Sequence, residues 1–178
     1  MSNSRFTTHQ LATAGVIAAL YAVLAYFASV FGIAYGPIQC RFSEALCVLP
    51  FLFPAATPGL FVGCIIANLF SPFVLDVVFG SMATLLACLV TYRLRNIRFK
   101  GLALAASLPP VLFNAVIIGI EIAVMFPDPT SSAPIWLACI TNGISVGIGE
   151  LISCTVLGVV LVKLIESNAA LRKVFVTE

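Results

Sequence analysis

Two polar residues interrupt the apolar stretch FNAVIIGIEIAV, which runs from Phe113 to Val124. Asn114 and Glu121 are seven residues apart, or almost two helical turns, so a helix carries both within about 20° of one face. Their amide and carboxylate groups can form hydrogen bonds that the surrounding apolar side chains cannot. If the stretch lies in lipid, such residues are costly unless paired or hydrated, and they are candidates for a binding site.

The composition indicates that these residues do lie in lipid. Hydrophobic residues make up 61% of the 178-residue chain, and mean hydropathy is +1.14. Only 9% of residues are charged, against roughly 25% in soluble domains. The sequence therefore predicts an all-α integral membrane protein with a single domain, 1–178. The net charge of +2 gives no reason to expect a nucleic-acid partner.

Six helices are expected, because about 20 apolar residues cross a bilayer core and four stretches are that long. Between the first two long stretches lie two shorter ones, separated by Pro54 and Pro58. Proline removes a backbone donor and disfavours helix in the residue before it, so these form a hairpin of short helices, either tilted or partly re-entrant. The predicted helices span 10–34, 42–54, 58–71, 74–94, 102–126 and 135–165.

The basic residues support this count. With six crossings and a cytoplasmic N-terminus, only Arg41 of the nine lysines and arginines faces outward. Basic residues concentrate on the cytoplasmic side of membrane proteins. Both termini are therefore expected in the cytoplasm, and a single spanning helix in place of the hairpin would put the basic stretch 93–100 outside.

On this topology, the polar residues gather in the outer half of the membrane. Glu121 is expected about 8 Å from the outer end of its helix, with Asn114 near mid-bilayer. The last helix offers Asn142 at the level of Glu121 and Glu150 at that of Asn114. Further polar groups enter from the hairpin and the helix after it: Gln39, Arg41, Glu44, Asn68 and Asp76. Together they predict a polar pocket that opens outward.

Structural alternatives exist for several of these residues. Arg41 and Glu44 could form a surface ion pair of little energetic value. Asp76 could cap the helix that it begins. Glu150 could be protonated and hold two helices together.

Small residues recur on the first helix at four-residue intervals, at Ala14, Ala18 and Ala22. Such a stripe lets another helix approach closely, and the partner is either another protein or a helix of the same chain. The six cysteines lie singly in apolar stretches and are expected to be apolar filler. No metal and no cofactor is expected, and no ATP-binding loop, HExxH or GxSxG motif occurs.

Several longer stretches resemble one family. They are GPIQCRFSEALCVLPFLFPAATPGLFVGC (36–64), ANLF (67–70), LDVVFGS (75–81), LPPVLFNA (108–115), GIE (119–121) and SVGIGEL (145–151). In this combination they resemble the QueT family, the queuosine-precursor-binding S components of energy-coupling factor (ECF) transporters. The similarity extends over residues 10–164.

The resemblance implies a fold, a function and partners. S components are six-helix proteins of the bacterial plasma membrane that bind a small molecule near the outer face. They have no ATPase and dock on a module of one transmembrane coupling protein and two ATPases. Ala14, Ala18 and Ala22 match the alanine surface that such proteins use for docking. The expected substrate is a 7-deazaguanine such as preQ0, preQ1 or queuine.

The chemistry of a 7-deazaguanine suggests which residues would hold it. Its N1–H and 2-amino group can both donate to one carboxylate, for which Glu121 is the first choice and Glu150 the second. Asn114, Asn142 or Arg41 suits the carbonyl, while Asp76 or Glu44 could balance an aminomethyl cation. Stacking on the ring is assigned to one of three aromatic residues: Tyr35, Phe42 or Trp136. The alternatives are an S component for another small vitamin-like molecule, an intramembrane enzyme that uses Glu121 and Glu150, and a scaffold that binds a partner helix.

Overall fold

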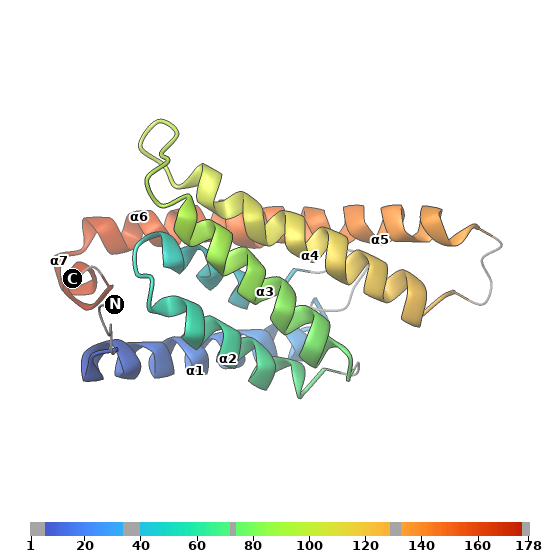
Figure 1. The fold of residues 1–178 in the computed structure, drawn as a ribbon, viewed down its shortest axis with the longest axis horizontal. Coiled ribbons are helices and arrows are strands. Elements are labelled where there is room, and N and C mark those ends of the chain that lie inside the picture. The colour runs from blue at the N-terminus through green and yellow to red at the C-terminus, as the bar shows by residue number, and fades with distance from the viewer. Residues whose placement is uncertain (1–5, 34–39, 72–73, 129–132, 176–178) are drawn as a thin grey trace, which may run out of the picture.

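The computed structural model describes residues 6–33, 40–71, 74–128 and 133–175, and every regular element within these ranges is a helix. This confirms an all-helical protein (Figure 1). The elements are α1 (Thr8–Val30), the 3-10 helix η1 (Phe42–Phe51), α2 (Ala56–Asn68), α3 (Asp76–Arg93), α4 (Leu104–Met125), α5 (Ile135–Glu150), the π-helix η2 (Leu151–Gly158), α6 (Val159–Ser167) and α7 (Ala169–Phe175).

Four helical stretches are long and apolar enough to cross a membrane. They are α1, α3, α4 and the continuous helix formed by α5, η2 and α6, which covers 33 residues from Ile135 to Ser167. Their outer surfaces carry large exposed apolar side chains such as Val16, Leu112 and Ile144, as lipid contact requires. The chain is therefore a multi-pass membrane protein, whereas six full crossings remain a prediction.

The predicted hairpin is a pair of short helices that meet near Pro54, but its first member differs from expectation. Stretch 42–54 contains a 3-10 helix of 10 residues, with Pro50 inside it, rather than an α-helix. The 3-10 geometry rises about 2 Å per residue, so η1 is about 20 Å long and shorter than a bilayer core. Residues 43–51 of η1 are all buried, which makes η1 the centre of the bundle rather than a part of its outer wall.

The last predicted helix is also irregular. Eight of its residues, Leu151–Gly158, form the π-helix η2, and the short helix α7, which the sequence did not predict, follows α6. π-helical turns inside α-helices are uncommon and often accompany functional sites. Because η2 packs directly on η1, the two irregular helices meet in the middle of the protein.

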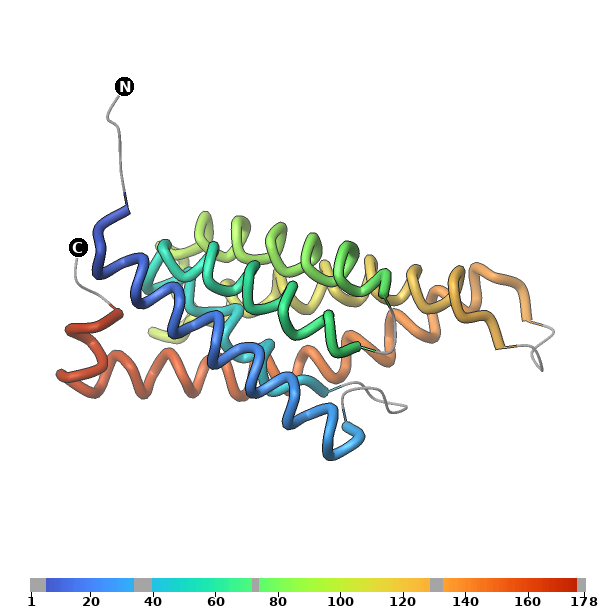
Figure 2. Tube along the Cα trace, turned by 90° about the horizontal axis from the view of Figure 1, so that it is seen from below, coloured from blue at the N-terminus to red at the C-terminus, as the bar shows by residue number. Residues whose placement is uncertain are grey.

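The ends of the bundle differ in charge. The start of α1, α7 and the connection from α3 to α4 lie at one end, and α4 and α5 extend furthest at the other (Figures 1 and 2). The first end includes the basic residues Arg93, Arg95, Arg98, Lys100, Arg172 and Lys173. By the positive-inside rule this would be the cytoplasmic end, and the cytoplasmic location of both termini stays a prediction.

Close packing of α1 on α2 accounts for the alanine stripe. Ala14 and Ala18 are buried, and a Cβ atom on Gly59 or Gly63 would lie 2.4 Å or 2.8 Å from their backbone oxygens. The structure thus uses these two alanines for packing within the chain, which was one of the two readings left open. Ala22 is half-buried.

Replacing Gly59 with alanine should therefore destabilise the protein by about 1–3 kcal/mol, as expected for overpacking. The new methyl group would meet backbone of α1, which moves only if the helices separate. Thermal unfolding in detergent, followed by tryptophan fluorescence, measures the effect. Gly15→Ala is the matched control, because nothing lies within 4 Å of a Cβ atom there and alanine is the better helix former. Equal melting temperatures for the two variants would contradict the close approach.

Candidate functional site

Glu44 lies in the first turn of η1 and is only 2% exposed. The Tyr21 hydroxyl of α1 donates a hydrogen bond to Glu44 Oε1, and the Cys47 thiol donates one to Oε2 over 3.1 Å. A buried carboxylate is stabilised only when donors satisfy its oxygens. These two donors come from different helices, so Glu44 is fixed in position at the junction of α1 and η1.

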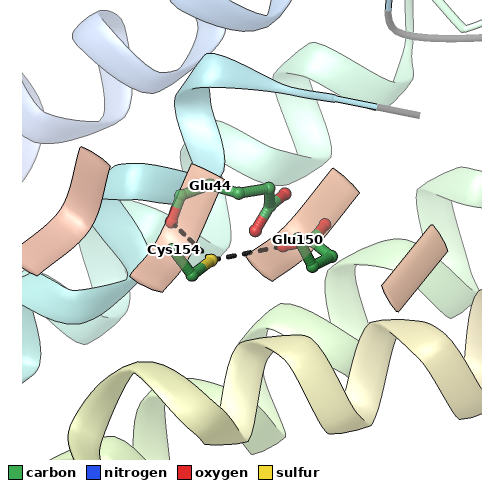
Figure 3. A group of neighbouring side chains, drawn as sticks. All are labelled: Glu44, Glu150 and Cys154. Atoms are coloured by element: carbon green, nitrogen blue, oxygen red, sulfur yellow. Dashed lines mark hydrogen bonds between the residues drawn. The ribbon is translucent and has the colours of Figure 1, made fainter. Parts of the chain in front are cut away.

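Glu150 ends α5, at the point where the helix becomes the π-helix η2. The Cys154 thiol lies 3.2 Å from Glu150 Oε2 and 3.2 Å from the backbone oxygen of Glu44. Figure 3 shows Cys154 between the two glutamates. One thiol thus connects η2 to η1, and it brings together two residues that are more than 100 positions apart in the sequence.

A second acidic group lies where α3 begins. Asp76 pairs with Arg41 over 3.6 Å and accepts a hydrogen bond of 2.6 Å from the Ser71 hydroxyl. The Asn68 amide donates to the backbone oxygen of Asp76 over 2.8 Å. Leu75, rather than Asp76, occupies the N-cap position. Arg41 thus pairs with Asp76, not with Glu44 as the surface ion-pair alternative supposed.

The glutamate pair Glu44 and Glu150 and the ion pair of Arg41 with Asp76 lie around one cavity inside the bundle. Arg41, Glu44, Asn114 and Glu150 all line it, and they come from four separate parts of the chain. The remaining wall consists of Cys64, Gly80, Ile118 and Val146. The free space is about 10 Å³ for the centre of a water-sized sphere, which is room for about one water molecule. A larger ligand would enter only if the lining side chains move apart.

Glu121 lies on α4 one turn beyond Ile118, on the face that Ile118 and Asn114 turn to the cavity. It is 4% exposed, and no residue in the described ranges donates a hydrogen bond to either of its carboxylate oxygens. It is near enough to Asp76 and Arg41 to interact electrostatically with both. Glu121 therefore belongs to the same polar region, although it does not line the cavity itself.

The fold and this site can now be compared with known proteins. The family model for the QueT transporter matches residues 11–167 of the chain. The chain belongs to the QueT transporter family. It is 36% identical over 78 residues to the queuosine precursor transporter QueT of Lactococcus lactis subsp. cremoris (strain MG1363). That match covers 44% of this chain and 46% of the Lactococcus protein. No solved structure gives a significant match.

Three other residues predicted for the binding site lie apart from the cavity of this QueT family protein. Asn142 lines a separate hollow of about 460 Å³ between the outer ends of α4 and α5. Trp136 is 61% exposed at the start of α5, and Phe42 is 38% exposed at the start of η1. Gln39 and Tyr35 lie outside the residues that the structure describes.

The sequence analysis missed three side chains that organise the site of the QueT family member. Tyr21, Cys47 and Cys154 hydrogen-bond the two glutamates, whereas the cysteines were predicted to be apolar filler. Their spacing held a signal, because Cys47 is three residues from Glu44 and Cys154 four from Glu150, which puts each pair on one helix face. Tyr21 had no such local signal, since its partner lies on another helix.

One carboxylate oxygen of Glu44, one of Glu150 and the sulfur of Cys154 all lie within 4.8 Å of one another. Carboxylates and a thiolate at such distances are ligand types that bind Zn²⁺. In the structure, however, the thiol proton is shared with the carboxylate and the Glu44 backbone. The same three residues therefore also form a hydrogen-bonded cluster.

Proposed function

We propose that this QueT family member is the substrate-binding S component of an ECF-type importer and captures a queuosine precursor, a 7-deazaguanine, at the outer face of the bacterial plasma membrane. The observation that carries the proposal is the convergence of Arg41, Glu44, Asn114 and Glu150 on one buried cavity. Polar residues inside membrane-spanning segments commonly mark a substrate pathway. The Lactococcus relative is named as a queuosine precursor transporter, which supports the choice of ligand.

The residues that line the cavity change which side chain is assigned to each part of the ligand. Glu150 lines the cavity and Glu121 does not, so Glu150 takes the role first given to Glu121. Its carboxylate accepts the N1–H and 2-amino protons of the ring, an arrangement of charge-assisted bonds. The Asn114 amide lies beside Glu150 and donates to the adjacent ring carbonyl. Glu44 closes the other side of the cavity, held by Tyr21.

Transport needs a source of energy that this chain lacks, because its sequence contains no ATP-binding loop. In the proposal, a transmembrane coupling protein and two ATPases supply it. Ala14 and Ala18 are covered by α2, so docking through α1 would use its outward face. A Cβ atom on Gly15 of that face would meet nothing within 4 Å, and Ala19 on the same side is exposed.

Mass spectrometry of the purified protein tests the substrate. Cells supplied with the 7-deazaguanine precursors are the source, and the protein is extracted in detergent, washed and denatured. We expect close to one equivalent of a 7-deazaguanine in the extract. Release of a different vitamin-like molecule, or no binding of added precursors in titration calorimetry, would contradict the proposal. Uptake in cells that do or do not express an ECF module tests the partners, and uptake without the module would exclude the S-component role.

A further inference from the structure

We infer that the site selects a ligand that carries a primary ammonium group, and that Glu121 receives this group. The inference rests on the proposed function and narrows its substrate from 7-deazaguanines in general to those with a cationic side chain. The balance of charge, the hydrogen bonds and the spacing of the residues each support it.

Acidic side chains outnumber basic ones in this region. Four acidic side chains, those of Glu44, Asp76, Glu121 and Glu150, are each no more than 5% exposed. Arg41 is the basic residue that the structure places among them, where it pairs with Asp76 and lines the cavity. The other titratable groups nearby are the donors Tyr21, Cys47 and Cys154. Cys64 also lines the cavity, and its sulfur accepts hydrogen bonds from Asn68 and Thr84. A cationic ligand would compensate the negative charge of these acidic groups, whereas an anionic ligand would add to it.

The hydrogen bonds show which carboxylate is open to a new partner. Glu44 has Tyr21 and Cys47 as donors, Glu150 has Cys154 and Asn114, and Asp76 has Ser71 and Arg41. Within the described ranges, Glu121 has a donor on neither oxygen, although both oxygens are buried. Leaving a buried carboxylate without donors is costly. An ammonium group, which has three donors and a positive charge, is the group that best satisfies it.

The spacing of the residues fits one molecule that bridges Glu150 and Glu121. The backbones of α4 and α5 touch where a Cβ atom on Gly119 would lie 2.6 Å from Cα of Gly143. Glu121 lies two residues outward of this level on α4, and Glu150 seven residues inward on α5. At 1.5 Å per residue their Cα atoms are about 13 Å apart along the bundle, and the two side chains lie between these levels or beyond them according to how they turn.

A 7-aminomethyl-7-deazaguanine is long enough to bridge the two carboxylates when the glutamate side chains turn toward each other. From its 2-amino nitrogen to its ammonium nitrogen it measures roughly 8 Å, given bond lengths of about 1.4–1.5 Å. A hydrogen bond at each end adds about 2.8 Å. With the pyrimidine edge on Glu150, the side chain therefore points outward along α4 toward Glu121, in the direction from which the ligand enters.

A matched pair of ligands tests the inference on the unmodified protein. The 7-aminomethyl compound carries a cation, and the 7-hydroxymethyl compound is neutral and nearly the same size. Titration calorimetry in detergent at neutral pH should give an affinity at least tenfold higher for the amine, because a charge-assisted bond is about twice as strong as a neutral one. Equal affinities would overturn the inference and leave the proposed function intact. Failure of both to bind would overturn the proposed function itself.

The variant Glu121→Gln tests the assignment of the residue. Glutamine has the same shape without the charge, and we expect the ratio of amine to hydroxymethyl affinity to fall at least fivefold. Glu166→Gln is the control, since Glu166 is a partly exposed residue of α6 that pairs with Arg98 and does not line the cavity, and its ratio should stay at the wild-type value. An unchanged ratio in Glu121→Gln would overturn the assignment. Should that variant not fold, the ligand pair on the wild-type protein still decides the preference for a cation.

Discussion

Replacing Glu150 with glutamine is expected to weaken binding of every 7-deazaguanine at least a hundredfold. The carboxylate has two oxygens for the N1–H and 2-amino donors, whereas glutamine presents an oxygen and an NH₂ group. One donor of the ligand would then face another donor in a buried cavity. Losing a hydrogen bond and leaving a polar group unsatisfied costs about 3 kcal/mol or more for charged partners, which corresponds to a hundredfold or greater change in Kd. Titration calorimetry in detergent measures the loss.

The comparison with Glu121→Gln makes this result specific. Glu150→Gln should weaken the aminomethyl and hydroxymethyl ligands by the same factor, because both present the same pyrimidine edge. Glu121→Gln should mainly affect the aminomethyl ligand. The glutamine at 150 still accepts from the Cys154 thiol through its oxygen, so the link between η2 and η1 is preserved. Wild-type affinity in Glu150→Gln would exclude the residue from the contact with the ring.

Much of the fold was predictable because the bilayer imposes simple requirements. Apolar stretches of about 20 residues located α1, α3, α4 and the α5–α6 helix, with ends within a few residues of those observed. Pro54 and Pro58 located the break between the two short helices. The 3-10 form of η1 and the π-helix η2 were not predictable, because they depend on how these two segments pack together rather than on their own residues.

The site was predictable in its composition and less so in its geometry. Polar residues in apolar helices are few, so Asn114, Glu121 and Glu150 were evident from the sequence. Their depth was estimated for straight α-helices, and this put Asn142 opposite Glu121. In the structure Asn142 does lie near that level, because Gly119 packs against Gly143, but it lines the hollow between the end of α4 and the start of α5 and not the cavity. The hydrogen bond of Tyr21 to Glu44 depends on the packing of α1 on η1, which sequence spacing does not specify.

The irregular helices explain how so many polar residues meet in one place. In a straight α-helix Glu150 and Cys154 would lie on one face, one turn apart. The wider turn of the π-helix changes the direction in which the residues after Glu150 point. Gly158, at the end of η2, lies against Val48 and the backbone of Ala45, which brings η2 close to η1. A site that depends on two uncommon backbone forms is also one that can rearrange, as the small cavity requires when a ligand enters.

Replacing Arg41 with methionine is expected to lower the free energy of unfolding by about 2–3 kcal/mol. Removing one member of a buried ion pair costs 3–5 kcal/mol because it leaves an uncompensated charge, and the estimate is reduced here because the Arg41 side chain is 15% exposed. The ion pair with Asp76 is long at 3.6 Å. Its importance comes from the surrounding carboxylates, which the guanidinium also faces. Thermal unfolding in detergent, compared at one heating rate, measures the change.

The exposed ion pair between Arg98 and Glu166 provides the control. Its shorter distance alone would predict a larger loss of stability in Arg98→Met than in Arg41→Met. Its nitrogen and oxygen are 2.6 Å apart, but the side chains are 41% and 31% exposed. Exposed ion pairs contribute about 0–1 kcal/mol, so Arg98→Met should change stability much less than Arg41→Met. Adding Asp76→Asn to Arg41→Met should restore part of the loss, because it removes the charge left unpaired. If the double variant were no more stable than Arg41→Met, the loss would come from the packing of the Arg41 side chain, and the acidic groups would not need a cation to balance them.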